Sequence, residues 1–167
     1  MNITYKKYII YLVILLLITL FNIVFLDFIE IKQITPDFCI ILVVWITLKD
    51  GRFTGLIAGF LIGLYLDIIS ADVIGTNAFA KTLCAFAASY FYKESATKQI
   101  TKKYSFILIT LFAALVHNLI YCFYYIRTSE HDFILYYVRY SLASTLYTTF
   151  FSSFVLLFQI TRNRIKY

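Results

Sequence analysis

Four charged side chains lie inside stretches of sequence otherwise dominated by apolar residues: Asp37, Asp67, Lys81 and Arg139. A charge at membrane depth is costly, and it usually has a partner or faces a wet cavity. At 1.5 Å per helical residue, Lys81 lies roughly 10 Å below one surface, within reach of Asp67, so we predict an ion pair between them. The charged cluster is then either a buried network that fixes helix register, or a pocket or partner-binding surface.

The sequence offers little for covalent or metal chemistry. It has two histidines, His117 and His131, no HExxH or P-loop motif and no suggestive Ser-His-Asp grouping. We therefore predict no enzyme activity, no metal site and no cofactor. The His117–Asn118 pair serves either interhelical hydrogen bonding or proton handling. Three residues inside separate apolar runs are interpreted as packing residues: Cys39, Cys84 and Cys122.

The elements that must position these residues are membrane helices. The chain of 167 residues is 62% hydrophobic, 20% aromatic and only 14% charged, which is far from the composition of a soluble domain. Because a membrane helix needs about 20 mainly apolar residues, we expect one transmembrane domain over residues 1–167, an all-α bundle of about six helices. The approximate spans are 8–26, 36–49, 53–71, 74–92, 104–126 and 133–160.

Lysine and arginine gather on one side of this arrangement, while the other side has only Lys32 and Arg127. This bias predicts an even number of spans with both termini in the cytoplasm. The basic residues behind the net charge of +6 then lie on the cytoplasmic side, where anionic lipid is expected. No folded domain remains that would gather these charges for nucleic acid, so no such partner is expected. The basic side carries Lys6, Lys7, Lys49, Arg52, Lys93, Lys98, Lys102, Lys103, Arg162, Arg164 and Lys166.

The third span contains GLIAGFLIGLYLD, residues 55–67, in which glycine recurs every four residues before a final aspartate. Helices in lipid associate through close packing and polar contacts. We therefore predict a packing ridge made of Gly55, Gly59 and Gly63, with the alanine-rich run 74–92 as the expected neighbour. Asp67 lies only about 40° around the helix from Gly63, at the edge of this ridge.

The single proline, Pro36, is predicted to lie in the first turn of the second helix, where its missing N–H costs nothing. Residues 35–83 combine this Pro-Asp start with an apolar helix, the basic turn KDGR, a glycine ridge ending in Leu-x-Asp and a glycine opening the next helix. This segment resembles the rod shape-determining protein family MreD. The residues that carry the resemblance are Pro36, Asp37, Gly55, Gly59, Gly63, Leu66, Asp67, Ser70 and Gly75.

The resemblance implies a non-enzymatic subunit of the cell-wall elongation machinery in the bacterial cytoplasmic membrane. MreD-like proteins partner the bitopic protein MreC and act with the MreB filament and the elongation synthase and transpeptidase. The family is also similar in fold to the S components of energy-coupling-factor transporters. The alternative function is therefore a substrate-binding subunit for a vitamin or another small molecule, with a ligand pocket open to the outer side.

Overall fold

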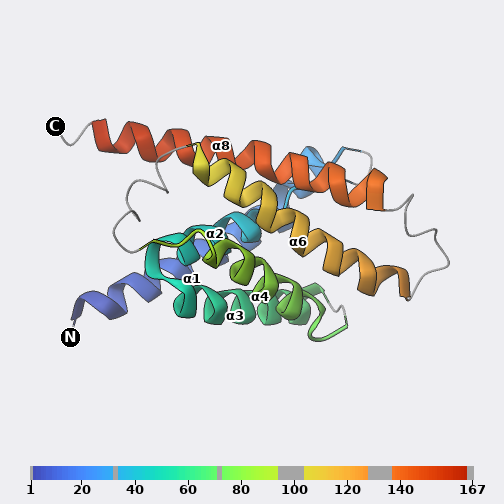
Figure 1. Cartoon of the computed structure of the whole chain (residues 1–167), viewed down its shortest axis with the longest axis horizontal. Coiled ribbons are helices and arrows are strands. Elements are labelled where there is room, and N and C mark those ends of the chain that lie inside the picture. The colour runs from blue at the N-terminus through green and yellow to red at the C-terminus, as the bar shows by residue number, and fades with distance from the viewer. Residues whose placement is uncertain (1, 32–33, 71–72, 94–103, 128–136, 165–167) are drawn as a thin grey trace.

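The structure is a computed structural model that describes residues 2–31, 34–70, 73–93, 104–127 and 137–164. These residues form six α-helices and one π-helical turn (Figure 1). In chain order the elements are α1 (Asn2–Ile29), α2 (Phe38–Asp50), α3 (Arg52–Ser70), α4 (Thr76–Ser89), α6 (Ser105–Arg127), η2 (Tyr137–Ser141) and α8 (Leu142–Arg164). Several residues used in the sequence analysis lie outside the described residues: Lys32, Lys98, Lys102, Lys103, His131 and Lys166.

The helices run back and forth along one axis, so that α1 begins and α8 ends at the same end of the bundle (Figure 1). We call this the basic end, because Lys7, Lys49 and Arg52 lie there at helix termini. We call the opposite end, where α2 and α4 begin, the cavity end. The predicted all-α membrane fold is confirmed, because four helices are long and apolar enough to cross a membrane. These stretches are Lys6–Phe25, Arg52–Ser70, Ser105–Tyr124 and Arg139–Leu157.

Helices α2 and α4 are shorter than the other four. They contain 13 and 14 residues, which rise about 20 Å each against a hydrocarbon core of about 30 Å. Helix α4 lies within the approximate span 74–92 that the sequence predicts. Gly75 explains the late start of α4, because its φ of 103° lies in the left-handed region that glycine tolerates and that a helix does not contain.

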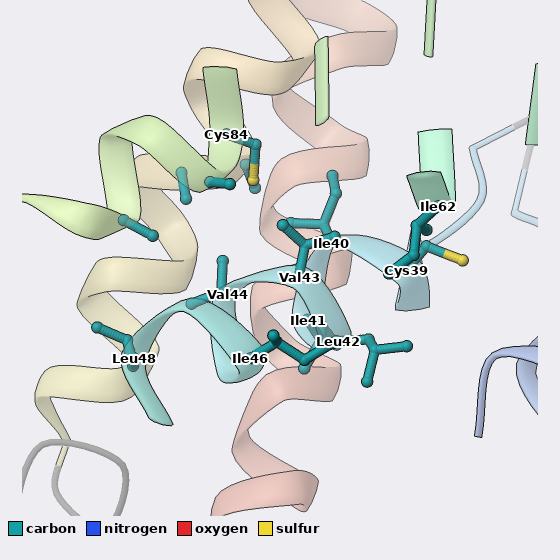
Figure 2. Close-up of a cluster of buried hydrophobic side chains, with 14 of the residues drawn as sticks. Cys39, Ile40, Ile41, Leu42, Val43, Val44, Ile46, Leu48, Ile62 and Cys84 are labelled. Carbon is teal, nitrogen blue, oxygen red and sulfur yellow. The ribbon is translucent and has the colours of Figure 1, made fainter. Parts of the chain in front are cut away.

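Short helix α2 forms the centre of the bundle. It is apolar on every side, and its side chains from Cys39 to Leu48 are buried except for that of Trp45. Figure 2 shows these side chains projecting from several sides of the helix, with Ile62 of α3 and Cys84 of α4 among their neighbours. A helix that is hydrophobic all round is expected to be enclosed by other helices. The position of α2 also places its first residues, at the cavity end, inside the bundle.

The α3–α4 contact depends on glycines of α3. A Cβ atom added to Gly59 would lie 2.6 Å from the carbonyl oxygen of Lys81, and one added to Gly63 would collide with the backbone of Ala78. Gly55 faces a different neighbour, because a Cβ atom there would meet Thr47 of α2. The ridge therefore brings the backbones of two helices, rather than one, close to α3.

At the start of α2, Asp37 is the N-cap residue. Its Oδ1 accepts hydrogen bonds from the backbone N–H groups of Cys39, at 2.9 Å, and Ile40, at 3.2 Å. Such a carboxylate satisfies N–H groups that a helix start leaves without partners. Pro36 consequently lies before the cap and outside the helix, so its predicted place in the first helical turn was wrong. The Pro-Asp pair still marks the start of α2, but the aspartate performs the capping.

At the basic end, α1 is held against α2 by a small polar group. The hydroxyl of Tyr11 donates to Asp50 Oδ2 at 2.6 Å, and Lys7 Nζ lies 2.5 Å from Asp50 Oδ1. The ammonium of Lys49 lies 4.2 Å from the ring centroid of Trp45, in the range of a cation–π contact. We refer to the Lys7–Tyr11–Asp50 group as the clasp. Much of the remaining surface of α1 is exposed and apolar, as expected of a helix that faces lipid.

Candidate functional site

A cavity of about 480 Å³ lies at the cavity end of the bundle. Its volume falls in the range of roughly 300–1,000 Å³ that is usual for small-molecule sites. It is partly open to the surface, and its lining combines charged, amide, hydroxyl and aromatic side chains with apolar ones. The lining residues are Asn22, Ile34, Thr35, Pro36, Asp37, Cys39, Leu66, Ser70, Asn77, Lys81, His117, Asn118, Tyr121, Tyr140, Ser141 and Ser144.

Lys81, on the second turn of α4, is the central polar residue of this cavity. Its side chain is only 1% exposed. Its Nζ lies 2.8 Å from Asp37 Oδ2, 3.2 Å from Asn77 Oδ1 and 3.3 Å from His117 Nε2. An ammonium group has three N–H bonds, so each has an acceptor. Burying a charge is costly unless the charge is paired and hydrogen-bonded, and Lys81 meets both conditions.

The ion pair that the structure shows is therefore Asp37–Lys81, not the predicted Asp67–Lys81. Depth along each helix placed Lys81 correctly near the cavity end, but it could not indicate which carboxylate faced it. Asp37 is further fixed by α8, because its backbone N–H donates to Thr148 Oγ1 at 2.9 Å. One aspartate thus contacts α8 through its backbone and α4 through its carboxylate, while capping its own helix.

The hydrogen bonds continue from Lys81 through the His117–Asn118 pair on α6. His117 Nδ1 lies 3.2 Å from Asn118 Oδ1, and Asn118 Nδ2 donates to Thr145 Oγ1 on α8 at 2.7 Å. Because Nε2 faces the Lys81 ammonium, which can only donate, the tautomer that fits carries its proton on Nδ1. That proton then points to the amide oxygen, so every contact joins a donor to an acceptor. We call the chain Asp37–Lys81–His117–Asn118–Thr145 the buried network.

Asp67 has a different role from the one predicted. Its carboxylate is buried and accepts hydrogen bonds from three backbone N–H groups at the start of α4: Gly75 at 2.9 Å, Asn77 at 2.8 Å and Ala78 at 3.1 Å. The partial positive charge of a helix N-terminus favours an anion there. Asp67 at the end of α3 thus caps the next helix and joins the two helices beyond the last glycine of the ridge.

Arg139 also lies apart from the buried network. It sits in the π-helical turn η2, is exposed, and holds its guanidinium 5.6 Å from the ring centroid of Tyr140. The four charged residues grouped by the sequence analysis therefore separate into an ion pair, a helix cap and a surface cation. The same turn contributes Tyr140 and Ser141 to the cavity, in keeping with the frequent occurrence of π-helical turns at functional sites.

Sequence reasoning missed much of the neutral part of the lining, including Asn22, Asn77 and Tyr121. Asn22 had a usable signal, since it is an amide in an otherwise apolar run of α1. The tyrosines had none, because 15 of them are spread along the chain and most membrane proteins place tyrosine near the interfaces. Among the described residues, no group of three or more His, Cys, Asp or Glu side chains could hold a metal ion. The cavity can thus bind a ligand through hydrogen bonds, its ion pair and ring contacts.

Comparison with known proteins gives one family. A sequence model of the family described as rod shape-determining protein MreD matches residues 3–162. The match extends the resemblance seen in residues 35–83 to nearly the whole chain. No curated protein and no solved structure matches the chain.

Proposed function

The chain belongs to the MreD family of rod shape-determining membrane proteins, and on this premise we propose that it is a non-enzymatic subunit of the bacterial cell-wall elongation machinery. It binds a bitopic MreC-like protein and acts with the MreB filament and the elongation synthase and transpeptidase, directly or through that partner. The observation that carries the proposal is the family match, which runs from α1 to α8.

The hydrogen bonding supports a binding role rather than a catalytic one. The Lys81 ammonium and the Asp67 carboxylate are both buried and occupied by groups of the protein itself. An acid, a base or a nucleophile must instead reach the reacting atoms of a substrate. The polar residues at this end thus hold helices together and shape a cavity.

We further propose that the protein lies in the bacterial cytoplasmic membrane with its basic end and both termini in the cytoplasm. The common location of the start of α1 and the end of α8 supports an even number of crossings (Figure 1). Fusions at the C-terminus test the orientation. A green fluorescent protein fusion should fluoresce and an alkaline phosphatase fusion should stay inactive, whereas the opposite pair of results would contradict the proposal.

Affinity purification of the tagged chain from native membranes tests the function. It should recover a bitopic MreC-like protein, and depletion of the chain should turn rod-shaped cells round. A matched control is an unrelated multi-pass protein with the same tag, which should not recover that partner. Loss of the chain without any change in cell shape would refute the proposed role.

The cavity favours one second candidate, a substrate-binding S component of a small-molecule transporter. A volume of about 480 Å³ at the end that we place outward is what such a subunit would need. The same purification separates the two candidates. An S component should recover a pair of ATPases with a transmembrane coupling subunit, and no MreC-like protein.

A further inference from the structure

We propose that the cavity binds a primary ammonium group, of the kind carried by the ethanolamine headgroup of a phospholipid or by a free amine. This binding goes beyond assembly with an MreC-like protein and does not depend on it. The inference rests on the charge that the cavity presents, on the polar groups already occupied by the protein, and on an amide oxygen that has no partner.

The first observation is which charge of the ion pair faces the cavity. Two charged residues line it, and the Asp37 side chain is 25% exposed whereas that of Lys81 is 1% exposed. All three N–H bonds of Lys81 have acceptors within the protein. A ligand therefore meets the carboxylate edge of the pair, and a positively charged group is the complementary one.

The second observation is that the usual anion-binding groups at this end are already used. The start of α2 donates its N–H groups to Asp37, and the start of α4 donates its own to Asp67. A helix start with free N–H groups would attract a phosphate or a carboxylate, but these two are occupied by the protein's own aspartates. Arg139, outside the lining, is exposed and lies against Tyr140. The cavity is thus poorly equipped to hold an anion.

The third observation is Asn22, on the α1 side of the cavity. Its Oδ1 is buried and has no hydrogen-bond partner among the described residues, although Asn22 lines the cavity. A buried acceptor without a partner is costly, and a ligand with an N–H group to donate would remove that cost. A primary ammonium has three N–H bonds to share between Asp37, Asn22 and a hydroxyl of the lining. The ring of Tyr121, also in the lining, suits a cation.

These requirements separate a primary ammonium from a quaternary one. A choline headgroup carries the same positive charge but has no N–H to donate, so it would leave Asn22 Oδ1 without a partner. In the orientation that we propose, the cavity end faces the outer membrane surface, where the headgroups of phospholipids lie. Phosphatidylethanolamine can thus present its amine at the opening, and a soluble amine can reach the same place from water.

Native mass spectrometry of the full chain, purified in detergent, provides the test. The protein is titrated separately with short-chain phosphatidylethanolamine, phosphatidylcholine and phosphatidylglycerol. We expect phosphatidylethanolamine to bind more tightly than either other lipid, by about tenfold or more. Equal binding of phosphatidylcholine would overturn the hydrogen-bonding argument, and preferential binding of phosphatidylglycerol would overturn the charge argument.

Competition with free ethanolamine distinguishes the two sources of the amine. If millimolar ethanolamine displaces the lipid, the cavity accepts a soluble amine. If ethanolamine leaves the lipid bound while phosphatidylethanolamine keeps its preference, the ligand is the lipid itself. Either result supports the proposal, and the absence of binding by both probes would refute it.

Variants of Asn22 test whether the amine binds in the cavity, and they leave the Asp37–Lys81 ion pair unchanged. Asn22→Asp adds a negative charge and should strengthen phosphatidylethanolamine binding, whereas Asn22→Lys fills the site with an ammonium and should abolish the preference. Glu30→Gln is the matched control, because Glu30 is exposed at the same end and lies outside the lining. An Asn22→Lys protein that keeps the preference, or a Glu30→Gln protein that loses it, would contradict the proposed site.

Discussion

Two lysine–carboxylate pairs lie at opposite ends of this bundle, and they differ in what surrounds them. At the basic end, Asp50 pairs with Lys7, whose side chain is 35% exposed. At the cavity end, Asp37 pairs with Lys81, whose side chain is 1% exposed. Water can solvate the Lys7 ammonium when its partner is lost, whereas the Lys81 ammonium is almost completely buried and contacts Asp37, Asn77 and His117. The same two residue types therefore contribute very differently to stability.

The two pairs also differ in what they connect. The clasp joins α1 to α2 and ends there. The buried network starts at α2, passes through Lys81 on α4 and His117 on α6, and reaches α8 at Thr145. In lipid, where helices gain nothing from hydrophobic association, such polar contacts help to set which helices meet and in what register. The buried network is therefore a property of the whole bundle, and the clasp is a local contact.

The largest expected effect is the loss of the Asp37–Lys81 pair. Asp37→Asn should lower the free energy of unfolding by about 3–5 kcal/mol, because it leaves the buried Lys81 ammonium without its charged partner. Lys81→Met should cost less, because the Asp37 side chain is 25% exposed and keeps its two backbone N–H donors. The double variant should cost less than the sum, by about 0.5–3 kcal/mol. Unfolding in mixed micelles with increasing sodium dodecyl sulfate measures all four proteins. Strict additivity of the two losses would show that the pair does not interact.

The Asp67–Lys81 pair, which was predicted from the sequence, serves as the control for this double-mutant cycle. Asp67→Asn combined with Lys81→Met should show a much smaller coupling energy, because the Asp67 carboxylate contacts backbone N–H groups rather than the ammonium. The two residues touch only indirectly, through Asn77. A coupling as large as that of the Asp37 cycle would restore the original prediction.

The sequence allowed the fold class to be predicted, but not the partner of Lys81. Composition and apolar runs predicted the membrane class and the approximate helices, because the lipid imposes both on any chain that crosses it. The spacing of the glycines indicated a close contact, and the structure shows that Gly59 and Gly63 face α4. A single sequence does not reveal how each helix is rotated about its axis or which helices are its neighbours.

The role of Asp67 was missed for a more specific reason. Its partners are backbone N–H groups, which every residue except proline carries. The residue types in the sequence therefore do not indicate which N–H groups Asp67 binds. A signal was nevertheless available, since every helix start leaves N–H groups without partners. Gly75 marked such a start eight residues after Asp67, at the distance of a short turn. The predicted partner was instead Lys81, a basic side chain at a similar depth in the next helix.

The second largest effect is expected where α3 approaches α4. Gly63→Leu should lower the free energy of unfolding by about 1–3 kcal/mol, because the added side chain collides with the backbone of Ala78. Gly75→Ala is the matched comparison, since a Cβ there meets nothing within 4 Å and only the left-handed backbone is strained. Gly75→Asn should be milder than Gly75→Ala, because asparagine tolerates that conformation. If Gly63→Leu were harmless, the helices would not be in close contact.

A smaller effect is expected from neutralising the cap of α4. Asp67→Asn keeps one carbonyl oxygen for the N–H groups at the start of the helix but loses the charge and the second acceptor. The cost should be about 0.5–2 kcal/mol, typical of a damaged helix cap. Asp67→Ala, which removes both acceptors, should cost more in the same unfolding experiment. A larger loss for the asparagine variant than for the alanine variant would contradict the capping role.

The smallest effect is expected at the clasp, and its dependence on salt should distinguish the two ends. Asp50→Asn should lower the free energy of unfolding by about 0–1 kcal/mol, because it leaves behind Lys7, whose side chain is 35% exposed to water, and the amide oxygen can still accept the hydrogen bond from Tyr11. Raising the salt concentration to about 0.5 M should remove most of this difference, since screening acts on exposed charges. The cost of Asp37→Asn should change less over the same range, because it leaves behind the Lys81 ammonium, whose side chain is only 1% exposed, and salt screens a buried charge weakly. Equal salt sensitivity of the two variants would mean that water enters the buried network as freely as it reaches the clasp.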